Sequence, residues 1–127
     1  MKTLRLILGD QLNSKHSWFK GDQSNFVYCL FEMRQETDNV KHHIQKVVGF
    51  FAAMQEFSDH LQSQGCELVY YTLDHKDNTQ SLTENLKQLI EKHTISTFEF
   101  QEPDEYRLDK QLLEFCKTLS IHSECFS

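Results

Sequence analysis

Short apolar runs alternate along the chain with segments in which apolar residues recur every three or four positions. Runs at 4–8, 26–31, 67–73 and 97–101 have the length and the β-branched and aromatic content of buried strands, and a weaker run lies at 120–126. Helical spacing occurs in three segments. The first covers 40–64, the second opens with the capping box Ser81-Leu82-Thr83-Glu84, and the third lies around 108–119. The pattern predicts strands and helices in alternation.

Strands that alternate with long helical crossovers indicate a parallel sheet with helices on both faces. The predicted fold class is α/β, a doubly wound, Rossmann-like sheet of five parallel strands. A length of 127 residues is enough for one hydrophobic core, and one Pro and four Gly leave little room for a flexible linker. We therefore expect residues 1–127 to form a single domain.

Candidate chemistry gathers where the strands end. The first strand stops at Gly9, which lets the chain turn sharply, and Asp10 and Gln11 follow directly. Ligands bind at the carboxyl edge of open parallel sheets, so Asp10 is a strong site candidate. Taken singly, acids in such loops are also common as solvated helix-start residues. Acidic residues follow the other strands as well: Glu36, Asp74, Asp77, Glu102, Asp104 and Glu105.

This acidic rim limits the possible ligands. Neither GxGxxG nor GxxxxGK[ST] occurs, which argues against dinucleotide or ATP binding through those motifs. The formal charge of −6 disfavours tight binding to a nucleic-acid backbone. Carboxylates and amides instead suit a hard cation, or a ligand that donates hydrogen bonds, such as a polyol chain or a heterocycle with ring N–H groups.

Cysteine and histidine positions indicate neither a metal site nor a catalytic triad. The four cysteines lack a CxxC pair, so buried reduced thiols are the simplest interpretation. His42 and His43 are adjacent on a predicted helix and point about 100 degrees apart, so they do not easily share a metal. GxSxG is absent, and no complete catalytic apparatus can be nominated. The lack of a membrane-length apolar run or a signal-peptide pattern predicts a cytoplasmic location.

Four motifs in order carry a family resemblance: LILGDQL at 6–12, Glu36 followed by His42-His43 and Lys46, FFAAMQEF at 50–57, and EPDEYR at 102–107. They resemble the N-terminal domain of the deoxyribodipyrimidine photolyase-related proteins, the iron–sulfur branch of the prokaryotic cryptochromes and photolyases. The resemblance covers nearly the whole chain.

What the resemblance implies is a light-driven DNA repair enzyme or a photoreceptor. In this family the N-terminal domain holds an antenna chromophore, here a 6,7-dimethyl-8-ribityllumazine or a similar dye. FAD, a 4Fe–4S cluster and the DNA belong to a larger C-terminal domain that is absent from this chain. Asp10 and Glu36 match positions that contact the lumazine, and Gln11, His42, His43 and Glu102 lie in the same motifs. The resemblance thus implies a dye-binding domain that is not catalytic by itself, does not contact DNA directly and has the C-terminal domain as its partner.

Two other functions stay open at this point. In the first, Asp10 with Asp74 or Glu102 holds Mg²⁺ in a phosphoester hydrolase or phosphotransfer domain. In the second, the chain is a non-catalytic interaction module, in which the exposed side of the helix predicted over 40–64 binds another domain or a second copy of the chain.

Overall fold

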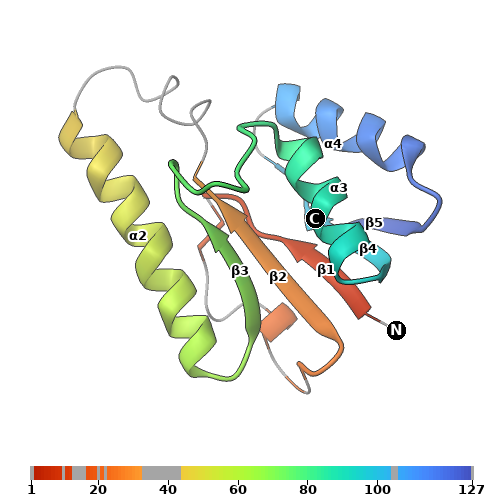
Figure 1. Ribbon diagram of the computed structural model, residues 1–127, viewed down its shortest axis with the longest axis horizontal. Coiled ribbons are helices and arrows are strands. Elements are labelled where there is room, and N and C mark those ends of the chain that lie inside the picture. Colours follow the sequence, from red (N-terminus) through yellow and green to blue (C-terminus); the bar gives the residue numbers. More distant parts are fainter. Residues whose placement is uncertain are drawn as a thin grey trace.

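The computed structural model describes residues 2–9, 11–12, 17–19, 21, 23–32, 44–103 and 106–126 (Figure 1). The strands are β1 (Lys2–Leu6), β2 (Phe26–Phe31), β3 (Glu67–Tyr71), β4 (Ile95–Gln101) and β5 (His122–Phe126). The helices are α2 (Ile44–Ser63), α3 (Leu82–Lys92) and α4 (Tyr106–Thr118), together with the short 3-10 helix η1 (Ser17–Phe19).

All five strands are parallel and lie in the order β3-β2-β1-β4-β5. The predicted α/β, doubly wound fold is confirmed. The main difference is at the first strand, predicted over 4–8, because β1 covers Lys2–Leu6 instead. Ile7 and Leu8 are buried beyond the last residue of the strand, and the Ile7 N–H still donates to the Cys29 carbonyl of β2 at 2.9 Å, so hydrogen bonding to β2 extends one residue past β1.

Helices cover the sheet on both faces (Figure 1). α3 and α4 supply Leu86, Leu89 and Leu112 to the core on one face, where they pack against Leu4 and Leu6 of β1. α2 and η1 cover the other face through Met54, Phe57, Leu61 and Trp18. The sheet is therefore the middle of three layers, with β3 and β5 as its edges.

The order of the strands creates a topological switch point. The chain builds outward from β1 through β2 to β3, and then α3 returns it to the other side of β1, where β4 pairs. Loops leave β1 and β4 in opposite directions, and the crevice between their carboxyl ends is where ligands bind in this fold class.

The four cysteines do not share one environment. Cys29 and Cys66 are buried, as expected, but Cys125 is exposed because it lies on the edge strand β5. Burial raises the pKa of the Cys29 thiol, so this thiol stays protonated within the core. A search for membrane spans among the described helices finds none that has the length and apolar character needed.

Candidate functional site

Gln11 joins the two strands that border the switch point. Its backbone N–H donates to the carbonyl of Leu8 over 2.9 Å, which closes a turn around Gly9. Its side-chain oxygen accepts a hydrogen bond from the Leu8 N–H at 3.2 Å, and its Nε2 donates to the carbonyls of Gln101 and Glu102 at 3.3 and 3.4 Å. The side chain thus ties the carboxyl end of β1 to the carboxyl end of β4.

Glu102 directly follows β4, at the same edge of the sheet as Gln11. Its backbone N–H donates to the carbonyl of Phe126 at 2.6 Å, which holds this segment against β5. The residue is exposed, so its carboxylate is available at the rim. Of the six residues nominated from the sequence, the structure therefore brings Gln11 and Glu102 together; Asp10, Glu36, His42 and His43 lie outside the described residues.

The contacts of Gln11 sharpen its predicted role. The oxygen and the nitrogen of its side-chain amide both form hydrogen bonds with the backbone. Gln11 therefore shapes the edge of the sheet, and few of its hydrogen-bonding groups are left for a ligand. The carboxylate of Glu102, by contrast, is a candidate acceptor for a ligand. Contact of either residue with a dye stays a prediction.

A buried carboxylate organises the rim on the β3 side. Glu32 directly follows β2 and is only 4% exposed. Its carboxylate accepts hydrogen bonds from Gln55 Nε2 at 2.9 Å, from the backbone N–H of Leu73 at 2.9 Å and from the hydroxyl of Tyr70. Three donors compensate for the loss of water around the charge, and they connect the end of β2 to α2 and β3.

The strand predicted over 26–31 puts Glu32 at the carboxyl edge of the sheet, but the sequence did not identify this internal role. The signal was its position directly after six apolar residues, too close to the core for a solvated side chain. No local pattern pointed to its partners, because Gln55 and Tyr70 lie 23 and 38 positions further along the chain.

The loop at 72–80 is braced through amide side chains. Asn78 Nδ2 donates to the carbonyls of Glu32 and Thr72 at 2.8 and 3.0 Å, and Asn85 Nδ2 donates to Asn78 Oδ1 at 3.0 Å. The Ser81 hydroxyl accepts from the N–H of Glu84 at 3.4 Å, which confirms the predicted N-cap. This part of the carboxyl edge is consequently held in one arrangement.

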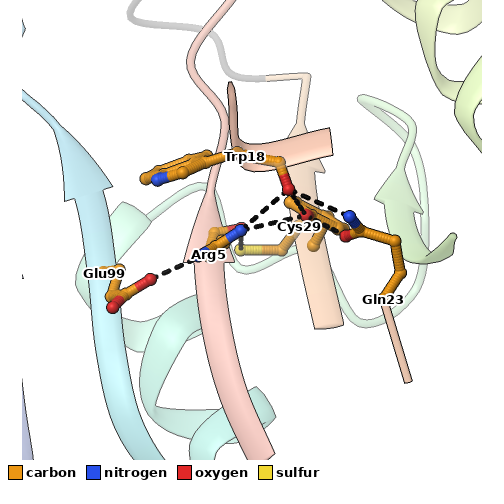
Figure 2. A network of polar contacts seen from close by, with 6 residues as sticks. Arg5, Trp18, Gln23, Cys29 and Glu99 are labelled. Carbon is orange, nitrogen blue, oxygen red and sulfur yellow. Dashed lines mark hydrogen bonds and ion pairs between the residues drawn. The ribbon is translucent and has the colours of Figure 1, made fainter. Parts of the chain in front are cut away.

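A second polar network lies under η1 on the face covered by α2. Figure 2 shows Arg5 of β1 between Glu99 of β4 and the backbone carbonyl of Trp18. Arg5 Nε is 2.8 Å from Glu99 Oε1, and Arg5 Nη1 donates to the Trp18 carbonyl at 3.0 Å. The same carbonyl accepts from the Tyr28 hydroxyl at 2.8 Å and from Gln23 Nε2 at 3.1 Å.

Aromatic rings surround the Arg5 guanidinium. Its Cζ lies 3.7 Å from the ring centroid of Phe26 and 5.0 Å from that of Trp18. Burial raises the pKa of the Tyr28 hydroxyl, and the nearby Arg5 charge opposes that rise. The network holds the chain that returns from the switch point to β2. It was not predicted from the sequence, because Arg5 stands inside an apolar run.

The arrangement at the switch point is suited to binding. It offers carboxylate and carbonyl oxygens on a rim held by hydrogen bonds, which complements a ligand that donates hydrogen bonds. Within the described ranges, the structure gathers no group of three His, Cys, Asp or Glu side chains that would hold a metal ion.

Comparison with known proteins identifies the family. The family model for deoxyribodipyrimidine photo-lyase-related protein matches residues 5–127. The chain is also 33% identical over 122 residues to a (6-4) photolyase from Agrobacterium fabrum (strain C58 / ATCC 33970). That alignment covers 95% of this chain and 24% of the relative, so the chain spans about a quarter of the relative's length. The chain belongs to the deoxyribodipyrimidine photo-lyase-related protein family.

Proposed function

We propose that this chain is an antenna-chromophore-binding domain of a photolyase-related, light-driven DNA repair protein or photoreceptor. The dye is a ribityllumazine or a similar heterocycle, seated at the carboxyl edge of the sheet between β1 and β4. The observation that carries the proposal is that Gln11 and Glu102 meet at the carboxyl ends of the adjacent strands β1 and β4, in a chain that matches the family from residue 5 to 127.

The chemistry of the edge supports a dye of this kind. The ring N–H and ribityl hydroxyl groups of a lumazine are hydrogen-bond donors, and the rim supplies acceptors. We assign Asp10 and Glu36 as the main acceptors, and His42, His43 and Glu102 as further contacts of the dye. A rim held by Gln11 and Asn78 loses little conformational entropy when the dye binds.

This role needs no catalytic group in the domain. Excitation transfer requires a bound dye at a fixed distance and orientation from a flavin. FAD, the 4Fe–4S cluster and the DNA contacts are assigned to the C-terminal domain of a longer parent protein, and the charge of −6 is consistent with DNA binding elsewhere. The name of the relative favours a six-four photoproduct as the parent's substrate.

The experiment is a titration of the purified chain with 6,7-dimethyl-8-ribityllumazine. Trp18 is the single tryptophan, so quenching of its fluorescence reports binding, and co-elution of the dye's absorption band on gel filtration confirms it. The Asp10→Ala and Glu36→Ala variants each weaken binding about tenfold, the cost of one hydrogen bond to a charged acceptor. Glu56→Ala, which removes an exposed carboxylate from α2, leaves binding unchanged.

Two results would overturn the proposal. One is a flat titration with the lumazine and with flavin, folate and deazaflavin dyes. The other is Mg²⁺-dependent phosphoester hydrolysis that disappears in the Asp10→Ala variant, which would move the chain into a different functional class.

A further inference from the structure

A shallow groove lined by side chains that carry polar groups lies away from the switch point, between α2 and the edge strand β3. Its volume is about 230 Å³. β3 is an edge strand and β2 separates it from β1, so the groove is at one edge of the sheet and does not adjoin the switch point between β1 and β4. The side chains of α2 and of the end of β3 line it: Gln55, Ser58, Asp59, Gln62, Tyr70 and Thr72.

Hydrogen bonds set the walls of the groove. The Tyr70 hydroxyl and Gln55 Nε2 both donate to the buried carboxylate of Glu32. Gln62 Nε2 donates to the Ser58 hydroxyl at 3.0 Å, and Ser58 itself is only 2% exposed. The orientation of these side chains is therefore fixed before any ligand arrives, which reduces the entropy cost of binding.

Charge excludes several ligand classes. The Asp59 carboxylate is part of the wall and the Glu32 carboxylate lies beneath it, whereas no Lys or Arg is among the described residues that line the groove. Phosphates and carboxylates are repelled by this arrangement. Glu32 already accepts three hydrogen bonds, so it is a poor metal ligand here. A wholly apolar ligand would take water from the exposed Asp59 carboxylate without replacing its hydrogen bonds.

A neutral molecule with several hydroxyl groups fits what remains. Each hydroxyl of such a ligand can donate to the Asp59 carboxylate or to the amide oxygens of Gln55 and Gln62, and the other three side chains of the wall, Ser58, Tyr70 and Thr72, add hydroxyl oxygens that can accept. The volume is below the range of about 300–1,000 Å³ for drug-sized ligands, so the ligand is small. We propose that the groove between α2 and β3 binds a small polyol, of monosaccharide size.

The inference does not rest on the proposed dye site, because the two sites share no residue. It is tested by titrating ¹⁵N-labelled protein with ribitol, a linear polyol, and with D-glucose, a cyclic one. The side-chain amide signals of Gln55 and Gln62 shift with at least one of them, with dissociation constants in the millimolar range. The two probes tell a linear ligand from a cyclic one.

Two matched variants and a titration with inorganic phosphate serve as controls for the binding of the polyols. Asp59→Ala weakens the binding about tenfold, the cost of one hydrogen bond to a charged acceptor. Glu56→Ala removes an equally charged, exposed side chain of the same helix outside the groove and leaves the binding unchanged. Inorganic phosphate leaves the two amide signals in place. The proposal is overturned by amide signals that stay fixed with both polyols, by equal losses in both variants, or by shifts caused by phosphate.

Discussion

Arg5 and Glu99 form an ion pair within the sheet, between the two strands that border the switch point. Arg5 Nε is 2.8 Å from Glu99 Oε1, and the side chains are 11% and 12% exposed. Little water reaches either charge, so each depends on the other, and Arg5 also donates to the Trp18 carbonyl and the Tyr28 hydroxyl. The pair links β1 to β4 on the face opposite α3 and α4.

Replacing Arg5 by Met is expected to destabilise the protein strongly. The apolar stem is kept, but Glu99 is left as a buried charge without its partner, which costs about 3–5 kcal/mol in the free energy of unfolding. Urea unfolding followed by Trp18 fluorescence measures the change. Lys2→Met is the control, because Lys2 and Glu67 form an exposed pair at 3.4 Å, and it should cost no more than about 1 kcal/mol. Equal losses in the two variants would contradict the assigned role of the buried pair.

Glu32→Gln is expected to lower the free energy of unfolding by about 2 kcal/mol. The shape is preserved, but an amide nitrogen replaces one of the two acceptor oxygens. In the place of Oε2 it would face the donors of Gln55 and Tyr70, and in the place of Oε1 it would face the Leu73 N–H, so at least one donor loses its acceptor. Urea unfolding measures the effect, and Glu56→Gln on the exposed side of α2 should change stability very little. In the Glu32→Gln background, Tyr70→Phe should cost less than in the unmodified protein, because the two residues share one hydrogen bond.

Gln11→Glu is expected to loosen the switch-point crevice. The substituted carboxylate cannot donate, and it would lie against the carbonyls of Gln101 and Glu102 that now accept from Nε2. Backbone amides near the carboxyl ends of β1 and β4 should exchange with deuterium at least about fivefold faster, which corresponds to roughly 1 kcal/mol of lost local stability. The same substitution at Gln88, exposed on α3, should leave exchange at this edge unchanged. Unaltered exchange in Gln11→Glu would show that Gln11 does not hold the two strands together.

Alkaline pH is expected to destabilise the fold. Burial raises the pKa of Cys29 and Cys66 above their ordinary value of 9.0, and of Tyr28 and Tyr71 above 10.0. Above those ordinary values the unfolded chain loses protons that the folded chain retains, so ionisation favours unfolding. The stabilisation is complete below about pH 8 and falls as the pH rises, by up to about 1.4 kcal/mol per pH unit for each group.

Unfolding free energies measured between pH 7 and pH 11 test this dependence. The Cys29→Ala variant should lose stability less steeply with pH than the unmodified protein, because one of the groups that stays protonated only in the fold has been removed. A flat profile in the unmodified protein would contradict the burial of these groups.

The sequence predicted the layers of this fold better than its internal polar contacts. The period of the apolar residues identified the strands and helices, and the rule for parallel sheets placed Gln11 and Glu102 at the same edge. Those predictions depend on patterns that repeat within a few residues. Arg5 and Glu32 do not belong to such a pattern, because a polar residue inside or beside an apolar run gives no information about its partner. The partner of Arg5 lies 94 positions further along the chain.

That separation has a consequence for synthesis of the chain. β1 pairs with β4 at residues such as Arg5 and Glu99, so the centre of the sheet stays incomplete until almost four fifths of the 127 residues have been made. Pairing between strands so far apart is slow compared with local helix formation. During translation β1, β2 and β3 can assemble first, while one side of β1 has no neighbouring strand. The crevice beside β4 is therefore a late product of folding, and a ligand of that crevice meets a competent site only on a nearly finished domain.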